Sequence, residues 1–162
     1  MPSALRKQLL SLAAWISLIS YSLFMMYWLF IGFSREHRSG YMYNLIPFKT
    51  INNYITEYHH YNFHTWAINL FGNVAAFMPF GFLVPLLFPR FAKANRLTAL
   101  FLLVLVLIEA LQFAAQVGSF DVDDIILNMV GVWLGTIPHV KTRLKRRQVR
   151  PEQGRGNNTK IL

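Results

Sequence analysis

The chain contains no cysteine, which excludes a disulfide framework and any metal site built on thiolates. It also lacks a P-loop, a GxSxG nucleophile elbow and a dinucleotide-binding fingerprint, so no common nucleotide or hydrolase site is predicted. Charge is scarce as well: 14% of the 162 residues are charged and only seven residues are acidic, whereas 54% are hydrophobic. This composition excludes a disordered chain and indicates a membrane protein with one small domain.

Long apolar runs predict four helices, at about residues 8–33, 66–88, 97–117 and 125–140. About 20 apolar residues cross ~30 Å of hydrocarbon, a length that the middle two runs reach. The first run exceeds the ~7–15 apolar residues of a signal peptide and ends in bulky side chains, so we expect a retained helix. The fourth run is short and crosses only if the acidic residues before it lie at the interface. We therefore predict an all-α, polytopic membrane protein built as a four-transmembrane-helix bundle.

The basic residues are distributed unevenly among the segments that flank these runs. Two precede the first run, three lie between the second and third, and eight follow the fourth, so thirteen of the sixteen fall on one side. The positive-inside rule assigns that side, and with it both termini, to the cytoplasm. The loops at 34–65 and 118–124 are then extracytoplasmic.

We expect residues 1–140 to form the membrane domain and residues 141–162 to form a basic, disordered cytoplasmic tail. The basic cluster at 141–150 is typical of a topology signal and attracts anionic lipid headgroups. A nucleic-acid partner, which the net charge of +9 could suggest, is not expected, because the positive charge follows the membrane segments. The pattern leaves the oligomeric state open.

A few polar side chains lie at membrane depth. An ionisable group in hydrocarbon costs about 2.5–3.5 kcal/mol on insertion scales, so it needs a partner or a function. Helical spacing puts the members of each predicted helix on one face, and the 1.5 Å rise per residue puts them in the outer half of the bilayer. We therefore expect them to converge on one polar pocket that opens outward. They are Asn69 and Asn73 in the second helix, Glu109 and Gln112 in the third, and Asp121, Asp123, Asp124 and Asn128 at the start of the fourth.

Several of these residues also have a structural explanation. Asn69 and Asn73 could form interhelical hydrogen bonds, which are worth about 0.6 kcal/mol each. Asp121 and Asp124 have the spacing of an N-cap and an N3 residue, so we expect at least one of them to cap the fourth helix. Glu109 is the residue that structure alone explains least. We therefore take Glu109 and Asp124 as the catalytic candidates.

Two further patterns have simple interpretations. His60 and His64 are four residues apart, but no HExxH-type carboxylate accompanies them, so neither a metal site nor a cofactor is predicted. Gly131 and Gly135 form a small-xxx-small pair, which favours close packing against another helix of the same chain.

Four blocks of the sequence resemble those of the VanZ-like family of small bacterial membrane proteins. The blocks follow one another with the family's order and spacing across about residues 44–135, and together they are specific. They are NLIPF at 44–48, NLFGNVAAFMPFGF at 69–82, IEALQ at 108–112 and FDVDDIILNMVG at 120–131. The first block adds Asn44 to the candidate binding residues.

The resemblance implies a bacterial inner-membrane protein and a link to resistance against the glycopeptide teicoplanin, for which the family is named. It also suggests enzymes that act on lipid headgroups or lipid-linked cell-wall precursors. We therefore expect a protein that binds or modifies such a lipid, with Glu109 or Asp124 as base or nucleophile. Asn73, Gln112 and Asn128 would orient the substrate. A non-catalytic envelope scaffold that alters drug access, or a small transporter subunit, is the alternative.

Overall fold

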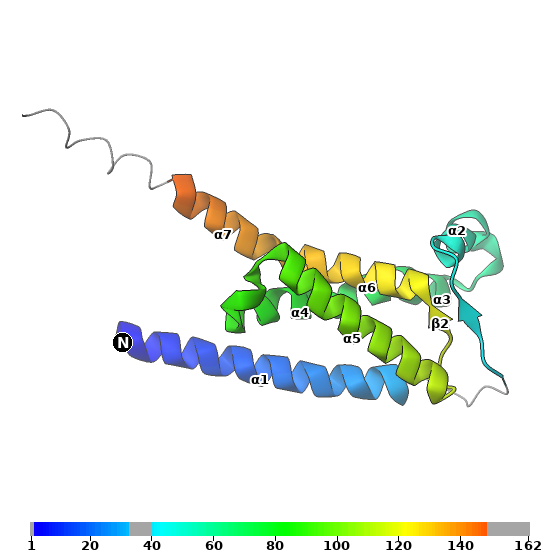
Figure 1. The fold of residues 1–162 in the computed structure, drawn as a ribbon, viewed down its shortest axis with the longest axis horizontal. Helices are drawn as coiled ribbons and strands as arrows, with labels where there is room; N and C mark the ends of the chain where they lie inside the picture. Colours follow the sequence, from blue (N-terminus) through cyan, green and yellow to red (C-terminus); the bar gives the residue numbers. More distant parts are fainter. Residues whose placement is uncertain (1, 33–39, 149–162) are drawn as a thin grey trace, which may run out of the picture.

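The computed structural model describes residues 2–32 and 40–148, with the backbone alone for residues 143–148. These residues form a helical bundle with one small two-stranded sheet at its end (Figure 1). The elements are α1 (Ser3–Phe30), β1 (Tyr43–Asn44), α2 (Lys49–Thr56), α3 (Phe63–Ala67), a π-helical turn (Ile68–Gly72), α4 (Asn73–Leu87), α5 (Ala94–Ala114), β2 (Phe120–Asp121), α6 (Val122–Gly135) and α7 (Ile137–Gln148). Short 3-10 turns lie at Tyr58–His60 and Pro89–Ala92.

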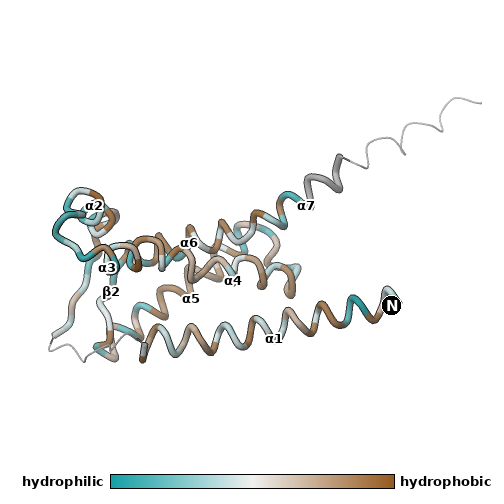
Figure 2. Tube along the Cα trace, turned by 180° about the vertical axis from the view of Figure 1, so that it is seen from behind, coloured by the Kyte–Doolittle hydropathy of each residue, from teal (hydrophilic) through white to brown (hydrophobic). Residues whose placement is uncertain are grey.

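The predicted all-α class is confirmed, and three helices are long and apolar enough to cross a membrane. They are α1, the continuous helix Phe63–Leu87, and α5. Figure 2 shows that hydrophobic residues predominate along α4, α5 and α6. The first three predicted helices therefore exist, although α1 and α5 each begin and end a few residues earlier than predicted.

The predicted fourth helix, 125–140, is wrong in its bounds. α6 covers only Val122–Gly135, which at 1.5 Å per residue spans about 21 Å, and α7 begins after a break at Thr136. Pro138 explains the break, because it has no N–H to donate to the carbonyl of Leu134, four residues earlier. The Thr136 hydroxyl instead donates to the carbonyl oxygen of Trp133 at 2.7 Å.

The basic tail also differs from the expectation of disorder, because its residues 141–148 belong to α7. Lysine, arginine, glutamine and leucine are good helix formers, which favours continuation of the helix. The start of α7 is held by His139, whose ring stacks on Phe82 of α4 and whose Nε2 donates to the Phe82 carbonyl oxygen at 2.7 Å. The remainder of the predicted tail, 149–162, lies outside the described residues.

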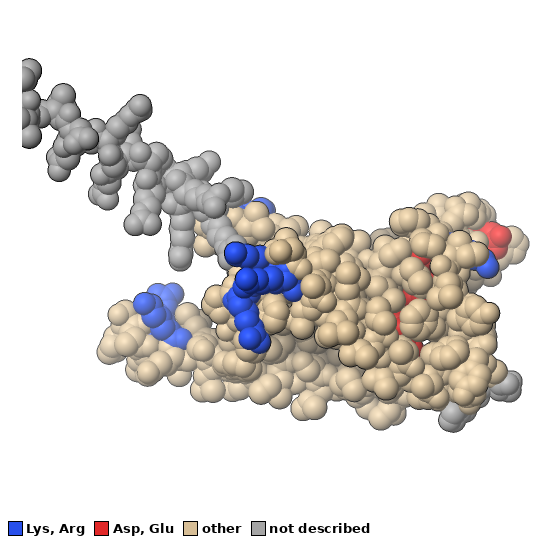
Figure 3. All heavy atoms as spheres, in the orientation of Figure 1, with Lys and Arg blue, Asp and Glu red and all other residues tan. Residues whose placement is uncertain are grey.

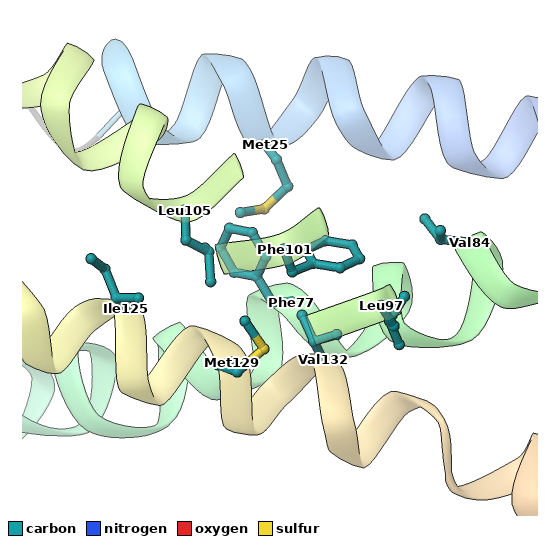
Figure 4. Packing of buried hydrophobic residues seen from close by; sticks show 9 residues of the cluster. All are labelled: Met25, Phe77, Val84, Leu97, Phe101, Leu105, Ile125, Met129 and Val132. Atoms are coloured by element: carbon teal, nitrogen blue, oxygen red, sulfur yellow. The ribbon is translucent and has the colours of Figure 1, made fainter. Parts of the chain in front are cut away.

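The core lies where α1, α4, α5 and α6 meet (Figure 4). α1 packs most loosely and buries only Ala14 and Met25. The Tyr21 hydroxyl joins α1 to α4 by donating to the Ala76 carbonyl oxygen at 2.9 Å. Side chains from all four helices fill the centre: Met25, Phe77, Val84, Leu97, Phe101, Leu105, Ile125, Met129 and Val132.

Charge separates along the bundle (Figure 3). Among the described side chains, Lys and Arg gather mainly at the end that holds the N-terminus and α7, which we call the basic end. Acidic side chains gather at the opposite end, beside α2 and the sheet, which we call the acidic end. By their place in the elements, the basic end carries Arg6, Lys7, Arg90, Lys93, Arg96 and Lys141, and the acidic end carries Glu57, Glu109, Asp121, Asp123 and Asp124.

At the acidic end, residues 40–56 form a segment that we call the strap. Its strand β1 pairs in parallel with β2, so that Tyr43 lies opposite Phe120 and Asn44 opposite Asp121. The Phe120 N–H also donates to the Met42 carbonyl oxygen at 3.1 Å. The strap is therefore hydrogen-bonded to the residues just before α6. Hydropathy does not predict this contact.

Glycines let α4 and α6 approach until their backbones touch. A Cβ added to Gly131 would overlap the carbonyl oxygen of Val74, and one added to Gly135 would overlap that of Met78. From the other side, a Cβ on Gly81 would overlap the carbonyl oxygen of Val132. The small-residue pair thus packs within the chain, as its spacing indicated.

Replacing Gly131 with Ala should destabilise the bundle by about 1–3 kcal/mol, because the new methyl group meets backbone that cannot move aside without separating α4 from α6. Gly72→Ala is the matched control, since its Cβ would meet Ile68 Cγ2 at 3.5 Å, an ordinary contact. Thermal unfolding in detergent measures both variants. Equal melting temperatures for the two would contradict the close-packed α4–α6 interface.

Candidate functional site

The acidic end brings together polar groups from three helices and the strap. Glu109 comes from α5, Asn73 from α4, Asp121 from the end of β2, and Asp123 and Asp124 from the first turn of α6. Glu109, Asp121 and Asp123 are buried, whereas Asp124 is only partly buried. Their hydrogen bonds give these four acids different tasks.

Asp123 fastens the strap to α6. Its side chain is 0% exposed, and both carboxylate oxygens accept hydrogen bonds from backbone N–H groups. Oδ1 accepts from Phe48, and Oδ2 accepts from Thr50 at 2.7 Å and Ile51 at 3.1 Å. These N–H groups lie at the N-terminus of α2, where a helix lacks internal acceptors and its dipole favours an anion. Asp123 therefore caps α2 from another helix.

The same contact holds Phe48 in an unusual conformation. Phe48 precedes α2 with a φ of 65° and a ψ of 4°, in the left-handed region that residues with large side chains rarely adopt. Such a conformation costs of the order of 1–3 kcal/mol and persists only where the surroundings enforce it. Here the charge-assisted hydrogen bonds to Asp123 enforce it.

Asp121 is the N-cap of α6. Its Oδ1 accepts from its own helix, at the N–H of Asp123, at 2.9 Å, as expected of an N-cap. Oδ1 also accepts from Asn44 Nδ2 at 3.1 Å, and Oδ2 accepts from the Thr50 hydroxyl at 2.7 Å. Asn44 in turn accepts from the N–H of Ile46 at 3.2 Å. Asp121 and Asn44 thus stabilise the strap.

Glu109 lies at the end of the stripe that α5 buries in the core. Leu97, Phe101 and Leu105 precede it at four-residue intervals, so the face that carries core side chains turns polar at the acidic end. Glu109 Oε2 accepts from the backbone N–H of Asp121 at 3.2 Å. In a capping box the N3 residue, here Asp124, would accept this N–H. The Asp121 N–H is thus bound from α5 by Glu109.

Asp124 pairs with α4 and faces α2. Its Oδ1 accepts from Asn73 Nδ2 at 2.7 Å. Tyr54 follows Thr50 by one turn of α2, and Thr50 contacts Asp121, so the α2 face that holds Tyr54 runs alongside the start of α6. Burial, followed by the negative charges of Asp124 and other neighbours, raises the pKa of the Tyr54 phenol. The phenol therefore stays protonated at neutral pH and can donate a hydrogen bond.

The other predicted residues lie apart from this group. Asn69 Nδ2 donates to the carbonyl oxygen of Thr65 in its own helix at 2.7 Å. Asn69 therefore bonds within its own helix, whereas Asn73, four residues later and beyond the π-helical turn, bonds to Asp124 of α6. Gln112 Nε2 donates to the Leu29 carbonyl oxygen at 2.8 Å and so caps the last turn of α1.

Asn128 lies one turn after Asp124 on the α6 face that packs against α4. It is 4% exposed, and its Oδ1 has no hydrogen-bond partner among the described residues. An unpaired buried amide oxygen costs of the order of 1–3 kcal/mol. Asn128 therefore contributes a polar group to the α4–α6 interface at the expense of stability.

Sequence reasoning missed Thr50 and Tyr54. Both lie in a polar segment between apolar runs, so neither stood out as a polar residue at membrane depth. The spacing of four between them is the signal that could have indicated one helical face. Among the described residues no group of three or more His, Cys, Asp or Glu side chains is arranged to hold a metal ion.

Comparison with known proteins gives one family. The family model described as VanZ/LLP1 matches residues 9–140, which includes all of the acidic-end residues described above. No curated protein and no solved structure matches the chain.

Asp123→Asn should weaken the attachment of the strap, whereas Asp121→Asn should be tolerated. At position 123 the new amide group would face a backbone N–H, which cannot accept a hydrogen bond, leaving a buried clash of donors worth about 1–3 kcal/mol. At position 121 the amide could donate to the Thr50 hydroxyl, which both donates and accepts. Hydrogen exchange of the α2 amides measures the difference. Equal protection in both variants would show that Asp123 does not hold the strap.

Proposed function

Because the chain belongs to the VanZ/LLP1 family, we propose that it is a multi-pass protein of the bacterial cytoplasmic membrane that binds or modifies a lipid headgroup or a lipid-linked cell-envelope precursor. The proposed binding site lies at the acidic end, around Asp124, Asn73 and Tyr54. Modification of such a precursor, or altered access to it, would connect the protein with teicoplanin resistance.

The proposed topology has four crossings and places both termini in the cytoplasm. The separation of charge along the bundle supports it, because the basic end corresponds to the cytoplasmic side under the positive-inside rule (Figure 3). In this arrangement α6 is a short crossing that packs against α4 and begins in a polar layer formed by its own aspartates. The acidic end then faces the outer surface of the membrane.

One observation carries the functional proposal: a partly exposed carboxylate, Asp124, is held by an amide side chain of a neighbouring helix. Asp121 caps α6, Asp123 caps α2, and Glu109 accepts the Asp121 N–H. Asp124 is bonded to Asn73 and is the least buried acid of this group. A carboxylate that is accessible, oriented by an amide and close to a protonated phenol is suited to general-base chemistry or to binding polar headgroups.

In the proposed site, Asp124 accepts a proton or a hydrogen bond from the lipid headgroup. Asn73 fixes the orientation of its carboxylate, and the Tyr54 phenol donates to a headgroup oxygen. Glu109 supports the site by holding the start of α6, since Oε2 accepts the Asp121 N–H and the side chain is only 4% exposed. Asp124 is therefore the stronger catalytic candidate of the two predicted.

Asp124→Asn should abolish the change that the wild-type protein produces in a bacterial lipid extract, while leaving the melting temperature near that of the wild type. The substitution keeps the size of the side chain and removes its negative charge. Mass spectrometry of the lipids after incubation with the purified protein measures turnover and bound lipid. Asp121→Asn is the matched control, because it alters a neighbouring aspartate that acts as a helix cap.

The same experiment separates the alternatives. Lipid that copurifies with the protein but stays unchanged would favour the non-catalytic scaffold. Full turnover by Asp124→Asn would contradict the role of this carboxylate. A protein that neither binds nor changes a lipid would contradict the proposed function as a whole.

A reporter fused after Leu162 should be active in the cytoplasm, and a reporter inserted after His60, in the exposed turn that follows α2, should be active outside it. Paired fusions of alkaline phosphatase and green fluorescent protein measure the two locations. An extracytoplasmic C-terminus would contradict the proposed crossing by α6.

A further inference from the structure

The strap exposes apolar side chains although it lies outside the three candidate membrane spans. It contains no acidic residue, and Lys49 is its single basic one. Seven of its large side chains are more than half exposed: Tyr41, Met42, Tyr43, Leu45, Ile46, Phe48 and Ile55. A surface of this kind in water would cost about 25 cal/mol for each Å² of apolar area.

In a loop that faces water, polar side chains point outward; in the strap, by contrast, Asn44 and Thr50 point inward and large apolar side chains point outward. Its polar side chains Asn44 and Thr50 point inward, where both bond to Asp121. Its backbone N–H groups are bound by Asp123, and β1 is paired with β2. These contacts fix the strap on its inner side, so the outward direction of its apolar side chains is set by the fold.

The apolar surface of the strap continues a lipid-facing surface of the bundle. The ring of Tyr41 lies 4.8 Å, between centroids, from the ring of Phe113 near the end of α5. On the same helix, Val106 and Leu102 lie seven and eleven residues before Phe113, so they share its face, and both side chains are exposed. Because α5 is one of the candidate membrane spans, hydrocarbon covers this face.

We infer that the strap is immersed in the outer interface of the lipid bilayer. Its tyrosines lie among the headgroups, where amphipathic rings are favoured, and its aliphatic side chains and Phe48 reach the upper acyl chains. The polar inner side of the strap faces the aspartates of α6. The acidic end is therefore covered by a membrane-embedded segment and is not open directly to water on this side.

This arrangement deepens the proposed function, on which the next step rests. A headgroup approaching Asp124 beside the strap keeps its acyl chains in the membrane throughout. The site would accordingly select substrates that carry a membrane-embedded chain over soluble molecules with the same headgroup. The immersion of the strap itself does not depend on any activity.

Site-directed spin labelling tests the immersion directly, and the absence of cysteine allows single-cysteine variants without other changes. Labels at Tyr43→Cys and Ile46→Cys, in the protein reconstituted into phosphatidylethanolamine–phosphatidylglycerol vesicles, should collide readily with oxygen. Their collision rates with the water-soluble nickel complex Ni-EDDA should be several-fold lower than that of a label at His60→Cys. Asn52→Cys, on the exposed polar side of α2, is the control within the strap.

Equal nickel accessibility at positions 43, 46 and 60 would overturn the inference, because the strap would then face water. Protection of positions 43 and 46 from both oxygen and nickel would also overturn it, in favour of a protein partner or a second copy of the chain. These measurements need no turnover. An immersed strap together with an inert protein would therefore refute the proposed function and leave the immersion standing.

Discussion

The acidic end depends on a buried carboxylate that binds backbone instead of a positive charge. Asp123 accepts three N–H groups at the start of α2, and this contact fixes the strap, the left-handed Phe48 and the position of Tyr54. A buried carboxylate is costly unless its lone pairs are satisfied, and a helix N-terminus satisfies several of them at once. The contact therefore stabilises both sides: it caps the N-terminus of α2 and gives the buried Asp123 carboxylate its hydrogen-bond donors.

The acidic residues have different contacts: Asp121 and Asp123 cap helices, whereas Asp124 binds the side chain of Asn73. Four carboxylates close together repel one another, and each needs hydrogen-bond donors to remain stable. The two helix starts and the Asp121 N–H supply donors for three of them, and Asn73 supplies a donor for Asp124. Close packing of α4 on α6 through Gly131 and Gly135 sets the distance between Asn73 and Asp124. The position of Asn73 relative to Asp124 is thus set by the packing of two helices and not by a loop.

The sequence predicted the parts of the fold that follow from hydropathy and missed those that follow from tertiary hydrogen bonds. Apolar runs located three helices that are long and apolar enough to cross a membrane, and the acids before Ile125 predicted a cap, which Asp121 provides. The strands and α2 could not be predicted, because they are short, polar and shaped by contacts with Asp121 and Asp123. The convergence of Asn73, Glu109 and Asp124 followed from helical depth. The contacts of Asn69 and Gln112 could not be predicted in this way. Asn69 lies in a π-helical turn, and Gln112 binds the end of α1; neither feature leaves a periodic pattern in the sequence.

One continuous helix contacts two partners, one on each side of the π-helical turn. Trp66, before the turn, donates to the Tyr54 carbonyl oxygen at 2.8 Å, while Asn73, after it, holds Asp124. Rewinding the same residues Ile68–Gly72 as a regular α-helix would rotate the residues after the turn relative to those before it, because an α-helix has fewer residues per turn than a π-helix. The π-helical turn therefore sets the rotation of Asn73 about the helix axis relative to Trp66. The winding of these five residues thus relates the contact of Trp66 with α2 to the contact of Asn73 with α6, and a substitution that restores the α-helical winding here would disturb one of the two.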